Sequence, residues 1–159
     1  MQPFPFITQA AHNDILWITF LIGALAQATK PFTYLLRTGE LDWGYLGQMG
    51  GMPSSHSAMV SALAIGVGIE EGFDSAACAV AVLLAVIVVY DAAGIRQQAG
   101  THAYVINRII SVLLKGHPIQ QIHLEEVLGH SRTEATVGVL FGIGLMFLWE
   151  LVVQPLFVR

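Results

Sequence analysis

The chain has 159 residues, of which 55% are hydrophobic and 11% are charged, and its formal net charge is −4. Soluble domains carry about 25% charged residues, so this composition indicates an integral membrane protein of one domain, residues 1–159. The negative charge offers no basic surface for nucleic acid, and the single cysteine, Cys78, excludes an intramolecular disulfide and a cysteine metal cluster.

We expect four apolar stretches to cross the membrane as helices, and a crossing takes about 20 residues. The first covers 14–37, and we expect Pro31 to kink it or to end its regular part. The second is predicted over 53–69, with Pro53 in its first turn. The third covers 75–90 and the last covers 133–157.

The segments between these stretches are polar or short. Residues 38–51 are predicted as a loop and 70–74 as a tight acidic turn. Residues 101–114 have a helical pattern but are too short to cross alone, so we expect an interfacial or re-entrant helix. The predicted fold is therefore all-α: an integral membrane helix bundle with about four spanning helices and one interfacial or re-entrant helix.

Tracing the chain through its turns places most ionisable groups of the spans on one side of the membrane. This side, called the polar face below, carries Lys30, Arg37, His56, Asp91, Arg96 and His130. The opposite side carries mainly acids, at positions 14, 70, 71 and 74. Because Lys and Arg concentrate on the cytoplasmic side, we expect the polar face in the cytoplasm and both termini opposite.

Residues 50–57, Gly-Gly-Met-Pro-Ser-Ser-His-Ser, join a polar loop to an apolar helix. Glycines let the backbone approach a bound group, and a helix N-terminus attracts anions. Ser54 and Ser55 offer hydroxyls, and His56 can move a proton near neutral pH. The stretch therefore predicts a phosphate site with an acid–base group beside it. The plain alternative is an ordinary capped helix start with a chance histidine.

His130 and Glu134 are four residues apart, a spacing that places both on one face of a helix. A carboxylate beside an imidazole fixes its tautomer and stabilises its cation, as a histidine nucleophile or base requires. His102 could compete as nucleophile, but no carboxylate follows it at that spacing. Asp91 could pair with Arg96 or orient a histidine. The histidines and glutamates of 117–134 match no zinc spacing, so no metal or other cofactor is predicted.

These residues resemble the divergent, small-membrane-protein branch of the type 2 phosphatidic acid phosphatase superfamily. The resemblance rests on residues 50–57, on 91–96 with Gly100 and Asn107, and on 128–130 with Glu134. Lys30 and Arg37 keep the spacing of the superfamily's first motif, although Thr38 replaces its proline. The second motif has Ser55 in place of glycine. The third is rearranged, with His130 and Glu134 matching its histidine and acid.

The resemblance implies metal-independent hydrolysis of a lipid phosphomonoester. His130 would attack phosphorus and form a phosphohistidine, and His56 would protonate the leaving alkoxide. The phosphate oxygens would be bound by a larger set: Lys30, Arg37, Arg96, Ser54 and Ser55. The implied partners are a phosphorylated lipid substrate and membrane lipid. The sequence leaves open whether the protein forms an oligomer and whether Arg132 or His102 belongs to the site. The alternatives are a carrier or flippase that uses the same anion site without turnover, and a non-catalytic scaffold.

Overall fold

The computed structural model describes residues 5–48, 50–113, 124 and 129–157. The described residues form helices and loops without a strand, so the all-α prediction is confirmed. In chain order the elements are α1 (Pro5–Ala11), α2 (Asp14–Thr38), a 3₁₀ turn η1 (Trp43–Leu46), α3 (Ser55–Glu71), α4 (Ala76–Ala93), α5 (Ile95–Leu113), α6 (Arg132–Leu148), a π-helical turn η3 (Trp149–Val153) and α7 (Gln154–Phe157).

Within the described residues, three helical stretches are long and apolar enough to cross a membrane. They are Asp14–Thr38, Ala76–Val112 and Arg132–Leu156. The fourth predicted crossing, α3, has 17 residues, which lies at the lower end of the roughly 17–25 that a crossing takes. The molecule is thus a helical membrane bundle.

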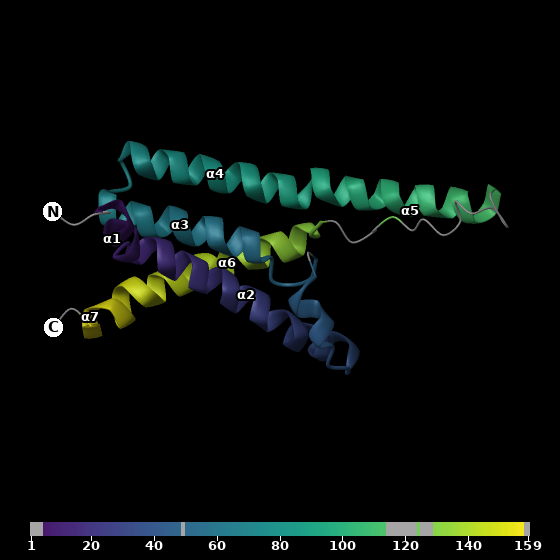
Figure 1. The fold of residues 1–159 in the computed structure, drawn as a ribbon, viewed down its shortest axis with the longest axis horizontal. Coiled ribbons are helices and arrows are strands. Elements are labelled where there is room, and N and C mark those ends of the chain that lie inside the picture. Colours follow the sequence, from purple (N-terminus) through teal and green to yellow (C-terminus); the bar gives the residue numbers. More distant parts are fainter. Residues whose placement is uncertain (1–4, 49, 114–123, 125–128, 158–159) are drawn as a thin grey trace.

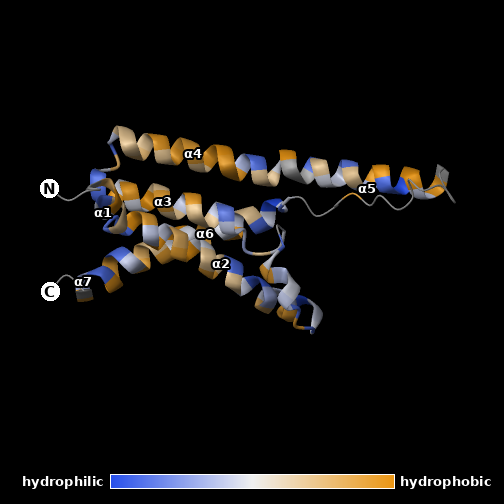
Figure 2. Ribbon diagram, viewed as in Figure 1, coloured by the Kyte–Doolittle hydropathy of each residue, from blue (hydrophilic) through white to orange (hydrophobic). Residues whose placement is uncertain are grey.

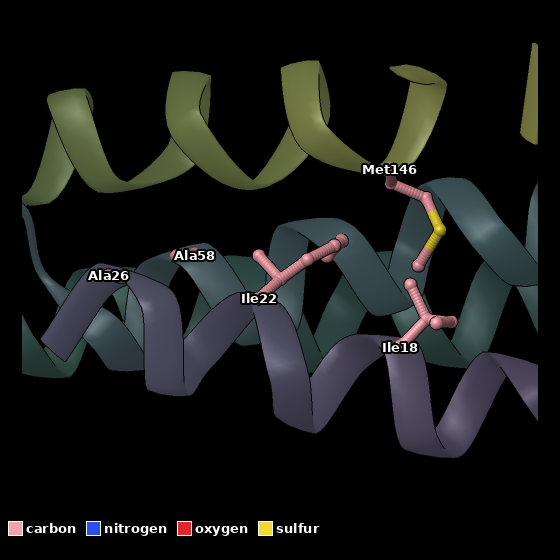
Figure 3. Packing of buried hydrophobic residues seen from close by; sticks show 6 residues of the cluster. Ile18, Ile22, Ala26, Ala58 and Met146 are labelled. Atoms are coloured by element: carbon pink, nitrogen blue, oxygen red, sulfur yellow. The ribbon is translucent and has the colours of Figure 1, made fainter. Parts of the chain in front are cut away.

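Helix α3 is the centre of the bundle and packs against α2, α4 and α6. Helices α1 and α7 lie at one end of the molecule, and the junctions that lead into α3 and α6 lie away from that end (Figure 1). The buried apolar cluster joins α2, α3 and α6 (Figure 3), and its members are Ile18, Ile22, Ala26, Ala58, Ala62 and Met146. Half of these are alanines, which permit the close helix approach that drives association in lipid.

Two glycines of α6 allow its backbone to lie against α3. A Cβ atom on Gly138 would come within 2.5 Å of the carbonyl oxygen of Ser54, and one on Gly142 would collide with the Ala58 carbonyl. Because both obstacles are backbone atoms, they cannot turn aside as a side chain would. The small residues predicted to pack closely therefore do so at the α3–α6 contact.

Helices α2, α3, α4 and α6 begin with side-chain caps. The N-cap side chains of Asn13, Ser54, Ser75 and Ser131 each accept a hydrogen bond from the N–H three residues on. The cap at Ser54 corrects the predicted start of α3: Pro53 precedes the helix instead of lying in its first turn, because Ser54 satisfies one of the free donors of the first turn.

Pro31 does not end α2, which continues to Thr38, so that part of its prediction is wrong. The hydroxyls of Thr29 and Thr33 donate to the α2 carbonyls of Ala26 and Lys30, 2.8 and 2.9 Å away. Hydroxyl side chains and neighbouring helices commonly make proline tolerable in membrane helices.

Helix α5 starts at Ile95, earlier than predicted, and runs on from α4 instead of turning back toward the bundle (Figure 1). Together the two cover residues 76–112. At 1.5 Å per residue that is roughly 55 Å, well beyond a hydrocarbon core of about 30 Å. Helix α4 is apolar over most of its surface, whereas α5 alternates apolar and polar residues (Figure 2). We therefore place α4 in the membrane, and the interfacial position of α5 stays a prediction.

Candidate functional site

A polar cavity of about 500 Å³ lies between the last turns of α2, the loop that carries η1, and the start of α6. Its lining includes three of the predicted site residues, Lys30, Arg37 and Glu134. The remaining walls come from Thr33, Tyr34, Thr38, Tyr45, Gln48, Gly51 and Met52. The structure thus brings two cations and one carboxylate, distant in sequence, to a single cavity, called the anion pocket below.

One face of α2 supplies the cationic wall. Lys30, Tyr34 and Arg37 follow at spacings of four and three, which align side chains along a helix. The Tyr34 ring stacks on the ring of Tyr45 from η1, with centroids 4.2 Å apart. This stack fixes the loop wall against the helix wall. Arg37 is exposed near the helix end, so its guanidinium can reach a ligand.

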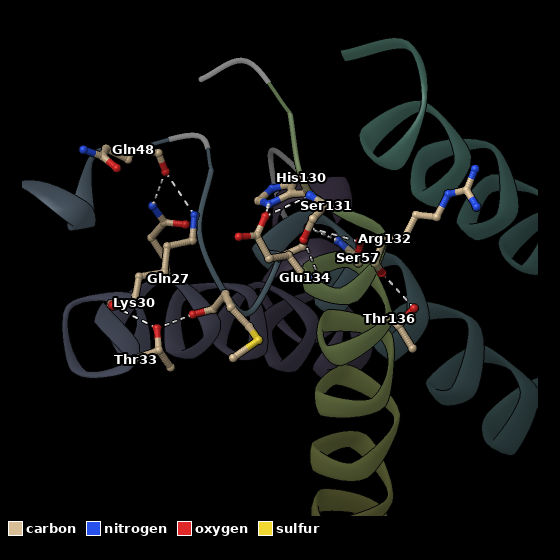
Figure 4. A network of polar contacts seen from close by, with 12 residues as sticks. Gln27, Lys30, Thr33, Gln48, Ser57, His130, Ser131, Arg132, Glu134 and Thr136 are labelled. Atoms are coloured by element: carbon tan, nitrogen blue, oxygen red, sulfur yellow. Dashed lines mark hydrogen bonds and ion pairs between the residues drawn. The ribbon is translucent and has the colours of Figure 1, made fainter. Parts of the chain in front are cut away.

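The loop is also attached to α2 by hydrogen bonds (Figure 4). The Lys30 ammonium donates to the carbonyl oxygen of Gln48, 3.0 Å away, and the Gln27 side-chain amide donates to the same oxygen and to that of Leu46. The Thr33 hydroxyl donates to the Met52 carbonyl. Lys30 is only 1% exposed, so its ammonium holds the loop against α2 as well as lining the pocket.

The start of α6 positions Glu134. Its carboxylate accepts a hydrogen bond from the Ser131 N–H at 2.9 Å, and its own N–H donates to the Ser131 hydroxyl at 3.2 Å. This reciprocal capping box fixes the rotamer of Glu134. The same carboxylate oxygen lies 3.6 Å from Nδ1 of His130, an electrostatic contact longer than a hydrogen bond (Figure 4).

His130 is 3% exposed and its Nε2 has no hydrogen-bond partner among the described residues. A carboxylate on the Nδ1 side favours a proton there, which leaves the Nε2 lone pair for nucleophilic attack. The ring does not line the anion pocket, whereas Glu134 does. The predicted His130–Glu134 pair is therefore present, with the carboxylate at the pocket wall and the imidazole outside it.

Two backbone hydrogen bonds connect the helix ends around this pair. The N–H of Ser54 donates to the carbonyl oxygen of Glu134, and the N–H of His130 donates to that of Ala92, each at 3.1 Å. The first joins α3 to α6, and the second joins the segment before α6 to the end of α4. Asp91, next to Ala92 and half-buried, is thereby placed near the His130 segment.

Gly51 and Met52 of the stretch 50–57 line the anion pocket, whereas its predicted site residues, Ser54, Ser55 and His56, do not. Ser54 is buried and its hydroxyl oxygen accepts hydrogen bonds from the N–H and the hydroxyl of Ser57, at 3.3 and 3.1 Å. Ser55 is half-buried, and His56 is exposed in the first turn of α3. The capping interpretation of the serines accounts for what Ser54 does here.

The remaining candidates lie on α5, at the start of α6 and in the segment between them. Arg96 belongs to α5, but its side chain lies outside the described part of the structure. His102 is exposed on α5, which extends away from the bundle (Figure 1). Arg132 is exposed and points to the opposite side of α6 from Glu134 (Figure 4). His117 and His123 lie outside the described residues.

The sequence did not lead us to predict the uncharged residues that line the pocket. Tyr34 could have been found, because it falls on the same helical face as Lys30 and Arg37. Tyr45 and Gln48 could not, since only the folded loop brings them to α2. Likewise, no spacing in the chain predicts the role of Gln27.

A sequence profile of the Divergent PAP2 family matches residues 11–145. The chain belongs to this family. It is 40% identical over 129 residues to a Bacillus subtilis (strain 168) protein titled "Uncharacterized membrane protein YuiD", covering 74% of this chain and 82% of that relative. No solved structure matches this chain. The resemblance drawn from residues 50–57, 91–96 and 128–134 is thus confirmed, and the chain is a phosphatase-related integral membrane protein of this family.

Proposed function

We propose that this family member hydrolyses a lipid phosphomonoester at the anion pocket. The observation that carries the proposal is the convergence of Lys30, Arg37 and the His130-bound Glu134 on one cavity at the polar end of the bundle. An ammonium and a guanidinium are suited to bind phosphate oxygens and to stabilise charge as it develops there. The membrane setting favours a substrate whose apolar part stays in the bilayer.

The proposed reaction has two steps. In the first, Nε2 of His130 forms a bond to phosphorus while the bond from phosphorus to the lipid oxygen breaks, and His56 gives the leaving oxygen a proton. In the second, water attacks the phosphohistidine, the P–N bond breaks and inorganic phosphate leaves, with His56 taking the water proton. Glu134 stabilises the imidazolium in both steps. Asp91, Arg96, Ser54 and Ser55 keep their predicted supporting roles as part of this proposal.

Attack by His130 requires a movement, because its buried ring is outside the pocket. Either the His130–Glu134 pair turns toward the bound phosphate or the loop before α3 moves aside. This same observation favours one alternative, a carrier or flippase for a phosphorylated lipid. Such a protein would bind phosphate at Lys30 and Arg37 and would never expose His130 to it.

Phosphate release separates the two functions. The purified full-length protein would be given phosphatidic acid in mixed micelles, with excess chelator, and inorganic phosphate would be measured. We expect release that vanadate inhibits and that His130→Ala reduces at least about a hundredfold, the scale of lost acid–base or nucleophilic catalysis. His102→Ala is the matched control and should retain activity. Binding of phosphatidic acid without release would favour the carrier, and chelator-sensitive release restored by one metal would contradict the metal-independent reaction.

We further propose that the anion pocket faces the cytoplasm. The support is the distribution of charge: the described cations of the polar end include Lys30, Arg37, Arg108 and Arg132, whereas the other end carries acids at 14, 70, 71 and 74. Arg108 is the informative one, because it lies on α5 outside the pocket. Positive residues next to short loops are retained on the cytoplasmic side.

A further inference from the structure

A second cavity, of about 630 Å³, lies between α4 and α6 with α3 as its floor. It shares no lining residue with the anion pocket. Its α6 wall includes Arg132, Thr136 and Val139, a spacing of four and three along one helix face. Its α4 wall includes Val86 and Tyr90, again four apart. The volume is in the range of about 300–1,000 Å³ typical of ligand sites.

The cavity is apolar along most of its length and polar at one end. The aliphatic hydroxyls on its walls are already used: that of Thr136 donates to the Arg132 carbonyl at 2.8 Å, and that of Ser61 donates to the Ser57 carbonyl at 2.7 Å. The polar end lies where the end of α4 meets the start of α6, at the bond between His130 and Ala92. Arg132 and the phenol of Tyr90 are found at this end.

Arg132 stands where a cation is electrostatically disfavoured. It is the first residue of α6, and the N-terminal end of a helix carries a partial positive charge that attracts anions and repels cations. Its guanidinium forms no hydrogen bond or ion pair with a described side chain, and it points away from Glu134 (Figure 4). An anion bound beside Arg132 would be attracted by both the guanidinium and the helix end.

We propose that this groove is a binding site for an anionic membrane phospholipid. One acyl chain lies between α4 and α6, along Val86 and Val139, and the phosphate lies beside Arg132 with Tyr90 at the headgroup. An occupant that is apolar along its length and anionic at one end matches the division of the cavity. The site is separate from the anion pocket and does not depend on hydrolysis there.

Photolabelling of the purified full-length protein in nanodiscs tests the site. The probes are phosphatidylglycerol and phosphatidylcholine with identical chains, each carrying a diazirine at mid-chain. Phosphatidylglycerol is a phosphodiester, so the proposed phosphomonoesterase would not consume it. We expect labelled peptides from both groove walls, with phosphatidylglycerol favoured about fivefold, the scale of one cation acting on anionic lipid.

Matched variants identify the contacts. Val86→Trp should block the chain and remove groove labelling, whereas Ile87→Trp, at the same depth and 65% exposed on α4, should not. Arg132→Gln should label equally with both lipids, and Arg37→Gln should keep the preference. Labelling that is unchanged in Val86→Trp, or equal for both lipids in the unsubstituted protein, would overturn the proposal. A disulfide between two copies of a Val86→Cys variant would overturn it as well, because a second copy would then occupy the groove. Loss of hydrolysis with these results intact would fault the proposed function alone.

Discussion

The main-chain N–H of Ser54 donates a hydrogen bond to the main-chain carbonyl oxygen of Glu134, 3.1 Å away. It joins the first turn of α6 to the N-cap of α3, and one turn further on Gly138 lies against the same residue, Ser54. The carboxylate of Glu134 reaches the anion pocket from this contact. The close packing of α3 against α6 therefore also positions the carboxylate in the pocket.

Gly138→Ala should lower stability by about 1–3 kcal/mol, the usual cost of overpacking. The added Cβ would come within 2.5 Å of the Ser54 carbonyl and must push α6 from α3. Thermal unfolding in detergent measures the loss. Gly144→Ala on the same helix is the control, because a Cβ there meets no atom within 4 Å. Equal melting temperatures for the two variants would show that the helices do not pack as described.

Glu134→Gln should separate capping from catalysis. The amide oxygen can still accept the Ser131 N–H bond, so the melting temperature should stay close to that of the unsubstituted protein. The charge that faces His130 is lost, and phosphate release should fall about a hundredfold. Glu134→Ala should lose activity and also about 1 kcal/mol of stability, the typical worth of a helix cap. Full activity in Glu134→Gln would remove the carboxylate from the mechanism.

Gln27→Ala should loosen the loop that closes the pocket. The side-chain amide donates to Leu46 and Gln48, at 2.8 and 3.2 Å, and it lies outside the pocket lining. Hydrogen exchange of residues 44–48 should become faster, while exchange in α3 stays the same. The neighbouring exposed residue offers a control, Ala28→Ser, which removes neither bond. Unchanged exchange in Gln27→Ala would mean that Lys30 and Thr33 hold the loop without it.

Arg37→Gln should weaken binding of vanadate to the pocket by about ten- to a hundredfold, because a hydrogen bond to a charged group contributes about 1.5–3 kcal/mol. Titration of the purified protein with vanadate measures the affinity. Arg108→Gln on α5, whose guanidinium donates to the Tyr104 hydroxyl outside the pocket, should bind vanadate normally. Equal losses in the two variants would indicate a general charge effect in place of a contact at Arg37.

Single-cysteine labelling tests the proposed orientation in a Cys78→Ala background. Glu40 and Asp74 are exposed and lie in the turns at opposite ends of the bundle. In intact cells an impermeant maleimide should label Asp74→Cys, and it should label Glu40→Cys only after permeabilisation. The reverse pattern would place the anion pocket outside the cytoplasm. Labelling of both in intact cells would contradict a single crossing of α3 between them.

What could be predicted followed from local patterns. The spans come from runs of apolar residues, and the His130–Glu134 pair comes from the spacing of a helix, so both depend on nearby residues alone. The polar face follows from the order of the spans. The tertiary details could not be found this way. The Tyr34–Tyr45 stack and the Gln48 carbonyl depend on how a loop folds back on α2. The hydrogen bond from the His130 N–H depends on the end of α4, and no spacing within 128–134 predicts that contact.

The two backbone bonds at the polar end, Ser54 to Glu134 and His130 to Ala92, use no side-chain atom. A substitution at any of the four positions therefore keeps both donors and acceptors, with one exception. Proline at 54 or 130 would remove the donor. Replacement of the imidazole or the carboxylate would thus leave both bonds between the helix ends in place, so the bundle offers a scaffold for other pairs of groups at these positions.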